Sequence, residues 1–204
     1  MHPDADALPE EFLDYIRSLE RHYLEHDDPI MQSGYYGGPE RWRQERATIL
    51  KAVERDGEIL DAGCANGYLL ECLVQWGREK GIALTPYGLD LGPRLVELAR
   101  KRLPAYADHF WVGNAWIWQP PRKFRYVYTL HDSVPDSFLG EYARRLLDRC
   151  VADGGRLIIG AYGSQSRNEP ARDVASALRE SGFAVAGSAS CGEFPVTRIA
   201  WVDK

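Results

Sequence analysis

The sequence predicts an α/β fold in which a mostly parallel sheet lies between two layers of helices. Two observations support this prediction. Short apolar runs that suit strands alternate five times with stretches whose apolar residues recur at helical spacing. The first run ends in a cluster of small residues, Asp61-Ala62-Gly63-Cys64-Ala65-Asn66-Gly67, which is typical of a tight turn from strand to helix. With 204 residues, 45% of them hydrophobic, the chain has the size and composition of one domain.

Two helices are predicted ahead of the sheet. Apolar residues in 9–26 recur in steps of three and four, so this stretch is predicted to be an amphipathic helix that lies across the sheet or the ligand mouth. The second helix begins at Pro39. Between them stands the glycine-flanked pair Tyr35-Tyr36, which suits either a lid over a ligand or a surface loop. We therefore divide the chain into a helical lid or cap segment, 1–56, and a core domain, 57–204.

The core domain is predicted to contain seven strands. The first ends at Leu60, and its helix follows from Leu69. Later strands are expected at 84–90, 109–112, 124–130 and 156–163, and further helices at 93–103, 135–151 and 170–181. The last two strands, 183–190 and 196–202, are expected to form a hairpin that completes the sheet with an antiparallel pair.

The small-residue turn is predicted to bind a ligand along bare backbone. Gly63, Ala65 and Gly67 leave little side chain between the main chain and a ligand, and the first N–H groups of the next helix point outward without partners. Dinucleotide folds use Gly-x-Gly-x-x-Gly, whose third glycine lets the helix pack on the strand. Here that position is Tyr68, so a nicotinamide or flavin dinucleotide is disfavoured.

The pattern Asp61-x-Gly63-x-Ala65-x-Gly67 resembles the first motif of class I S-adenosylmethionine-dependent methyltransferases, which usually have glycine in place of Ala65. Asp90 ends the second strand about 20 residues later, where an acid can accept both hydroxyls of a ribose. Gly113-Asn114-Ala115 resembles the adenine-binding motif of the same family, commonly Gly-Asp-Ala. The same family also resembles this chain around residues 153–155, where a predicted helix is followed by Asp-Gly-Gly and then by an apolar strand.

This resemblance implies a Rossmann-like three-layer fold with S-adenosylmethionine as cofactor and S-adenosylhomocysteine as product. It implies that Asp61 orients the methionine amino group, that Asp90 holds the ribose and that Asn114 holds the adenine. The other expected cofactor contacts are Gly63, Cys64, Ala65, Gly67, Leu91, Ala115, His131 and Tyr36.

The loop after the fourth strand carries the candidate catalytic residues, His131 and Asp132. Ligands in open α/β sheets bind beyond the carboxyl ends of strands, so this loop is expected to face the transferable methyl group. Either residue suits a general base, which is needed only for a phenol, an alcohol or a protonated amine. The alternatives are that His131 walls the cofactor site and that Asp132 caps a helix near Pro135.

The sequence favours a small-molecule acceptor. Little chain exists beyond the core fold, and a net charge of −5 argues mildly against a nucleic-acid partner. The alternatives are an RNA methyltransferase guided by the basic segment 41–46, a protein methyltransferase, or a protein that binds S-adenosylmethionine or S-adenosylhomocysteine without catalysis. The oligomeric state stays open.

The sequence also indicates the cellular location of the protein. No apolar run has the length to span a bilayer, and the first residues lack the basic and then apolar order of a signal peptide, so we expect a cytoplasmic protein without a membrane partner. The four cysteines show no metal-binding spacing, and we expect free thiols and no metal site.

Overall fold

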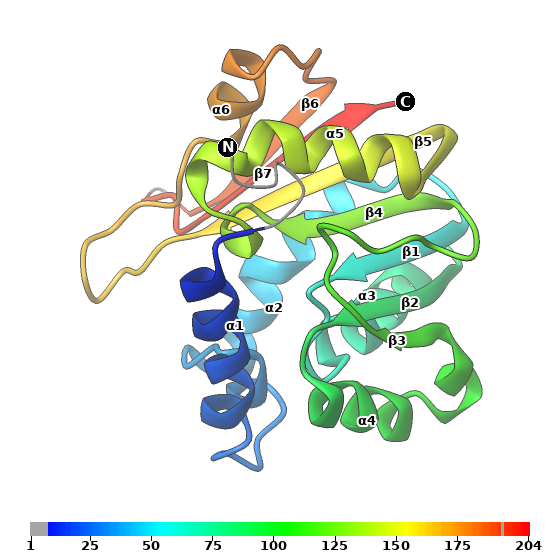
Figure 1. Cartoon of the computed structure of the whole chain (residues 1–204), viewed down its shortest axis with the longest axis vertical. Coiled ribbons are helices and arrows are strands. Elements are labelled where there is room, and N and C mark those ends of the chain that lie inside the picture. Colours follow the sequence, from blue (N-terminus) through cyan, green and yellow to red (C-terminus); the bar gives the residue numbers. More distant parts are fainter. Residues whose placement is uncertain (1–7, 193) are drawn as a thin grey trace.

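A seven-stranded sheet runs through the part of the chain that the computed structural model describes, residues 8–192 and 194–204 (Figure 1). The strand order is β3-β2-β1-β4-β5-β7-β6. The strands are β1 (Gly57–Ala62), β2 (Leu84–Asp90), β3 (Phe110–Val112), β4 (Phe124–Leu130), β5 (Val151–Tyr162), β6 (Gly187–Cys191) and β7 (Thr197–Asp203). Strands β1 to β5 pair in parallel, and β7 is antiparallel to both β5 and β6. The predicted mostly parallel sheet with a terminal antiparallel hairpin is confirmed.

Helices cover both faces of this sheet. They are α1 (Glu10–Tyr23), α2 (Gly38–Arg46), α3 (Tyr68–Glu79), α4 (Pro93–Arg102), α5 (Leu139–Arg149) and α6 (Val174–Glu180). Buried side chains of α5 and α6 pack on one face, and those of α2, α3 and α4 pack on the other. The three-layer Rossmann-like arrangement is therefore confirmed. Residues 1–7 of the predicted cap segment lie outside the described residues.

Alternation along the strands separates the two cores. In β1, Ile59 packs with the α3 side and Leu60 with the α5 side, and both are fully buried. In β4, Tyr126 and Tyr128 face the α3 side, whereas Val127 faces the α5 side. Successive side chains of a strand point to opposite faces, so a strand covered on both sides reads as a continuous apolar run. This explains why the central strands were visible in the sequence.

The Asp-Gly-Gly stretch lies inside β5, although we expected it to separate a helix from a strand that begins at residue 156. Phe124 pairs with Val151 and Tyr126 pairs with Arg156, so β5 carries three more residues than β4 over this interval. The extra residues bulge out of the ladder, and Gly154 has a φ of 68°, which suits glycine. Because pairing already begins at Val151, α5 ends earlier than predicted.

The helix predicted at 170–181 is also shorter than expected. Its first residue is Val174, because the carboxylate of Asp173 accepts a hydrogen bond from the backbone N–H of Ser176 and caps the helix there. The strand expected to begin at residue 183 pairs only from Gly187 onward.

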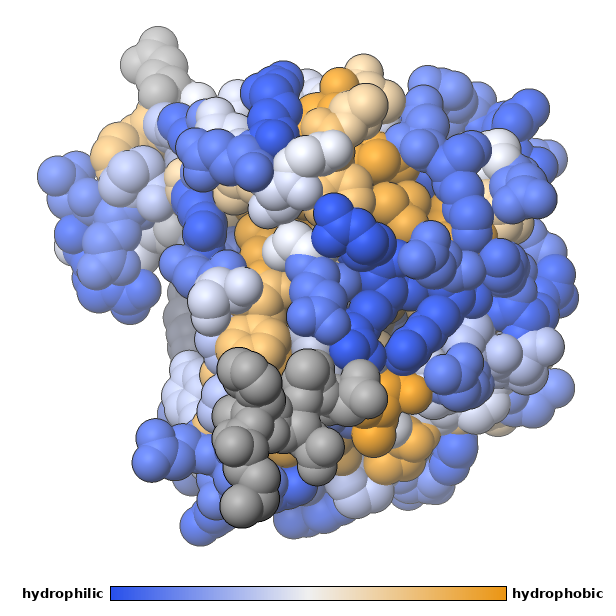
Figure 2. All heavy atoms as spheres, turned by 45° about the horizontal axis from the view of Figure 1, so that its top comes forward, coloured by the Kyte–Doolittle hydropathy of each residue, from blue (hydrophilic) through white to orange (hydrophobic). Residues whose placement is uncertain are grey.

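Hydrophilic residues dominate the face shown in Figure 2, and apolar residues appear between them in separate patches. Within the described ranges, no helix has both the length and the apolar character needed to cross a bilayer. Cys64, Cys72, Cys150 and Cys191 are free thiols, as expected.

Candidate functional site

A cavity of about 420 Å³ lies at the carboxyl ends of the central strands, beside the point between β1 and β4 where the strand order reverses. Helix α1 forms its roof through Phe12, Tyr15, Ile16, Leu19, Glu20 and Tyr23. Figure 1 shows α1, in dark blue, at the end of the sheet toward which β1 and β4 point. The strand ends supply the floor through Ala62 and Gly63, residues 89–92, residues 113–115, Leu130 and Asp132.

The cavity brings together seven of the predicted site residues: Gly63, Ala65, Asp90, Leu91, Asn114, Ala115 and Asp132. Five others do not line it: Asp61, Cys64, Gly67, His131 and Tyr36. The first group comes from four different strand ends, which the parallel sheet carries to one edge.

The small-residue turn after β1 is held against β2 by its backbone. The N–H groups of Gly63 and Cys64 both donate to the carbonyl oxygen of Leu89, at 2.8 and 3.1 Å. Gly63 has a φ of 107° and borders open space, because a Cβ there would meet only the Ser133 hydroxyl, at 3.8 Å. Ala65 has a φ of 45°, which is the left-handed region that favours glycine. Bare backbone therefore faces the cavity at Gly63.

Gly67 supports the turn from behind. Its φ is 74°, and a Cβ there would lie 2.8 Å from the Cβ of Ala99 in α4. Cys64 is also buried, and its thiol lies near the position that a Cβ on Gly88 would occupy. These two residues shape the turn without lining the cavity.

Asp90 connects the turn to the start of α4. Its Oδ2 accepts a hydrogen bond of 2.8 Å from the N–H of Ala65, and its Oδ1 accepts one of 2.8 Å from the N–H of Gly92. Burial raises the pKa of Asp90, and these backbone hydrogen bonds oppose the rise because they stabilise the charged form. The carboxylate thus fixes the turn while it also lines the cavity.

Asp61 lies at the end of β1 and is 3% exposed. Burial raises its pKa to about 8, and the negative charge of Asp90 adds to the rise. Within the described chain, the Asp61 carboxyl has no hydrogen bond to a donor that would stabilise its charge. A positively charged group near the turn would lower this pKa, so the arrangement favours a cationic ligand.

We expect replacement of Asp61 by asparagine to remove a pH dependence of stability. Because its pKa is about 8 in the folded protein against 3.8 ordinarily, the folded state retains a proton that the unfolded chain releases between these values. The contribution to stability is complete at low pH and is lost as pH rises toward 8. The free energy of unfolding of Asp61→Asn, relative to that of the wild type, should therefore increase by about 1 kcal/mol or more between pH 5 and pH 8, as measured by urea unfolding.

Asp153→Asn, at an exposed position in the β5 bulge, is the control for Asp61→Asn. An Asp61→Asn variant whose stability follows pH as the wild type does would contradict the raised pKa. Any fixed cost of burying an amide affects both pH values equally and cancels in this comparison.

Asn114, the residue predicted to hold adenine, lines the cavity. Its Oδ1 accepts a hydrogen bond of 3.0 Å from the N–H of Trp116 and so stabilises the turn after β3. Trp116 itself is fully buried, with its ring against Phe138 and Tyr142, and belongs to the core. Leu91 and Ala115 add apolar surface to the same part of the cavity.

His131 and Asp132 share one short 3₁₀ turn, Leu130 being its N-cap, but they differ in position. Asp132 lines the cavity and has no hydrogen bond or ion pair with any described residue. It does not cap α5, whose start has no side-chain cap. His131 does not line the cavity, and its Nδ1 is buried without a hydrogen-bond partner in the described chain. Burial lowers the pKa of His131, while the charge of Asp132 raises it.

The pair Tyr35-Tyr36, which suited either a lid or a surface loop, does not line the cavity. Tyr36 is exposed, and its hydroxyl lies 3.1 Å from Nε2 of His22 and 3.2 Å from Nε2 of His26. The ring of Tyr35 packs instead against Trp42. The roof is the amphipathic helix α1, whose spacing predicted a helix across the ligand mouth or the sheet.

Asn66 joins the turn to the segment that follows α1, a role that the sequence did not reveal. This residue is fully buried, and its Nδ2 donates to the carbonyl of Pro29 at 3.0 Å and to Oε1 of Gln32 at 3.1 Å. Gln32 in turn donates to the carbonyl of His26 at 2.7 Å. The sequence showed only that an asparagine stands within a small-residue turn. That observation does not identify hydrogen-bond partners more than 30 residues away.

The Asn66→Ala variant is expected to lose about 2 kcal/mol of stability, because the side-chain hydrogen bonds from Asn66 to Pro29 and to Gln32 and the one that it accepts from the N–H of Tyr68 all disappear. Limited proteolysis should show faster cleavage within 24–36. Gln32→Ala keeps the hydrogen bond from Asn66 to Pro29 but removes both the bond from Asn66 and the bond from Gln32 to the carbonyl of His26, so it should also be cleaved faster than the wild type. Unchanged cleavage in both variants would contradict the link.

Comparison with known proteins gives a consistent result. Residues 35–185 match a family model described as a methyltransferase domain. No match was found among curated proteins.

Three solved structures illustrate the similarity. An S-adenosylmethionine-dependent methyltransferase from Aquifex aeolicus is 17% identical. The match covers 87% of this chain and 99% of that protein, with a TM-score of 0.59. An O-methyltransferase family 2 protein from Planctomyces limnophilus, in complex with apigenin, is 11% identical. The match covers 81% of this chain and 58% of that protein, with a TM-score of 0.59. Phosphoethanolamine N-methyltransferase 1 from Haemonchus contortus was solved in complex with phosphoethanolamine and S-adenosylhomocysteine and is 13% identical. The match covers 100% of this chain and 52% of that protein, with a TM-score of 0.71. At these identities the similarity shows a shared fold.

Proposed function

The chain belongs to the class I S-adenosylmethionine-dependent methyltransferase family, and we propose that it methylates a small molecule held in the cavity beneath α1. The protein is an enzyme whose cofactor is S-adenosylmethionine and whose product is S-adenosylhomocysteine. The observation that carries the choice of acceptor is the roof. Because α1 covers the strand ends, the acceptor is a molecule small enough to fit beneath this helix.

The residues of the cavity fit the cofactor. Bare backbone at Gly63 leaves room for a ligand, Asp90 offers carboxylate oxygens suited to ribose hydroxyls, and Asn114 offers an amide suited to adenine. The buried carboxyl of Asp61 favours positive charge nearby. When bound, S-adenosylmethionine supplies a methyl group on a positively charged sulfur. The protein's task is then to align the acceptor with this methyl group, which can be worth about 7–11 kcal/mol.

Among the two candidate bases, Asp132 is the better supported. Its carboxylate lines the cavity and remains exposed, so it can take a proton and pass it to water. His131 does not line the cavity, so we propose that it supports the turn after β4. We further propose that 1–56 acts as the cap segment, with α1 as its covering element.

The basic segment 41–46 gives little support to an RNA acceptor. Arg41 pairs with Glu45 at 3.0 Å, and Arg43 pairs with Glu79. Arg46 is buried with its guanidinium 3.4 Å from the ring centre of Tyr162, and it also pairs with Glu45. Side chains that are already neutralised in this way contribute little to phosphate binding.

Calorimetric titration tests the proposal without knowledge of the acceptor. We expect S-adenosylmethionine and S-adenosylhomocysteine to bind at micromolar concentrations and NAD not to bind. A screen of small acceptors with S-adenosylmethionine, followed by detection of S-adenosylhomocysteine, then tests turnover. Binding of both ligands with turnover only on RNA or protein would refute the small-molecule acceptor, and cofactor binding without any turnover would indicate a non-catalytic binding protein.

A further inference from the structure

The charged side chains that line the cavity are all acidic. They are Glu20, Asp90, Asp132 and Asp136, and no described lysine, arginine or histidine lines it. A phosphate or carboxylate on the acceptor would meet like charges without a cation to bind it, whereas a positive group would be attracted. The cavity therefore discriminates between acceptors by charge.

Three of these acids already have partners. Glu20 accepts a hydrogen bond of 2.7 Å from the backbone N–H of Arg94. Asp90 accepts two hydrogen bonds, from the N–H groups of Ala65 and Gly92. Asp136 forms an ion pair with Arg172. Asp132 differs, since its carboxylate has no partner in the part of the chain that the structure describes. It is the acid available to a ligand.

The part of α1 that lines the same cavity as Asp132 is rich in aromatic residues. Phe12, Tyr15 and Tyr23 of α1 all line the cavity, and aromatic faces attract organic cations. Burial raises the pKa of Tyr23 to about 12, and the charges of Asp132 and Asp90 add to the rise. The hydroxyl of Tyr23 therefore stays protonated and can donate a hydrogen bond to a ligand in the cavity.

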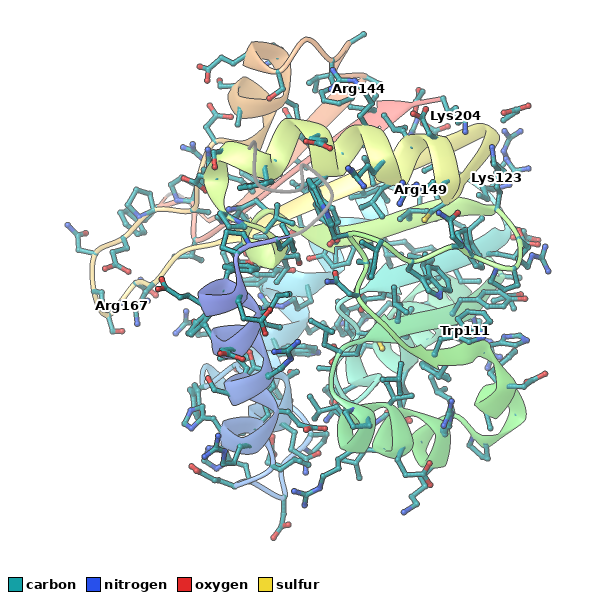
Figure 3. The ribbon with its side chains drawn as sticks, viewed as in Figure 1. Trp111, Lys123, Arg144, Arg149, Arg167 and Lys204 are labelled. Carbon is teal, nitrogen blue, oxygen red and sulfur yellow. The ribbon has the colours of Figure 1, made fainter. Side chains whose placement is uncertain are left out.

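Several basic side chains lie far from the cavity, and Arg172, which pairs with Asp136, does not line it. Figure 3 shows Lys123, Arg149 and Lys204 together at the end of the molecule away from α1. Arg167, on the loop after β5, pairs with Glu169 at 2.8 Å. Neither group lines the cavity, so the acidic lining keeps its attraction for a cation.

We propose that the acceptor is a small organic amine without a phosphate or carboxylate group, and that it enters as the ammonium form and binds to Asp132 beneath the aromatic roof. This inference rests on the proposed methyl transfer. The ammonium gives one proton to Asp132 and thence to water. The nitrogen lone pair then forms the new C–N bond to the methyl carbon, while the electron pair of the broken C–S bond stays on sulfur, which becomes a neutral thioether. Asp132 is in this way both binding group and proton acceptor.

The test measures binding to the protein saturated with S-adenosylhomocysteine, because this complex does not turn over. The probes are benzylamine, benzyl alcohol and benzoate, which share one ring, together with ethanolamine and phosphoethanolamine. We expect benzylamine to bind at least about tenfold more tightly than the other two ring compounds, and ethanolamine to bind more tightly than phosphoethanolamine. Equal or no affinity across the ring compounds, or preference for benzoate or phosphoethanolamine, overturns the inference.

Two variants locate the effect. Asp132→Asn should weaken benzylamine about tenfold while affinity for S-adenosylhomocysteine stays within about twofold of wild type. Asp153→Asn, an exposed acid remote from the cavity, is the matched control and should change neither affinity. Unchanged benzylamine affinity in Asp132→Asn overturns the role of Asp132. If S-adenosylhomocysteine itself does not bind the wild type, the failure belongs to the proposed function.

Discussion

The Asp90→Ala variant should bind S-adenosylhomocysteine about 100-fold more weakly than the wild type. The carboxylate accepts hydrogen bonds from Ala65 and Gly92, so its loss releases both the cofactor turn and the start of α4. Hydrogen bonds to a charged group are worth about 1.5–3 kcal/mol each, and the proposed ribose contact disappears with them. Calorimetric titration of the purified variant measures the loss.

Two comparisons make this result specific. Asp90→Asn preserves the shape of the side chain and one acceptor oxygen, and should fall between wild type and alanine. Asp56 also accepts a backbone hydrogen bond, 2.7 Å from the N–H of Ala83, but lies away from the cavity. Asp56→Ala should therefore leave cofactor affinity unchanged. Full affinity in Asp90→Ala would mean that the ribose is held by another residue.

A Gly67→Ala substitution should destabilise the protein by about 3 kcal/mol. The left-handed conformation of residue 67 costs an alanine about 1–2 kcal/mol. The added methyl would also lie 2.8 Å from the Cβ of Ala99, and forcing extra volume between an ordered turn and α4 costs a further 1–3 kcal/mol, roughly. Urea unfolding measures the change.

Gly81 offers a matched control for Gly67. It has nearly the same φ, 75°, but a Cβ there would meet no described atom within 4 Å. Gly81→Ala should therefore show the conformational cost alone, about 1–2 kcal/mol. Equal losses at the two positions would show that the contact with Ala99 relaxes freely, and that the packing of turn against α4 is not tight.

The predicted residues that line the cavity are those fixed by local chain geometry. Gly63 and Asp90 stand at strand ends, and a parallel sheet places every strand end at the same edge. Their positions therefore followed from finding the strands. The same reasoning placed Asn114 and Asp132 at the cavity.

The contacts that the sequence did not predict join segments without a fixed spacing. Nothing in Tyr36 distinguishes a lid from a surface loop, since its partners His22 and His26 belong to a helix whose placement is a matter of packing. The link from Asn66 to Gln32 likewise depends on how the N-terminal segment lies against the turn. The bulge at Gly154 was missed because a strand can absorb a turn-like Asp-Gly-Gly without ending.

The roof helix also has a kinetic consequence. None of the side chains of α1 is fully buried, so this helix is attached to the rest of the molecule less firmly than the helices that pack on the sheet. Elements with few buried contacts open at low free energy, without unfolding of the whole domain. We therefore propose that α1 opens as a lid to let products leave between turnovers, and that the rate of its opening sets an upper limit on kcat.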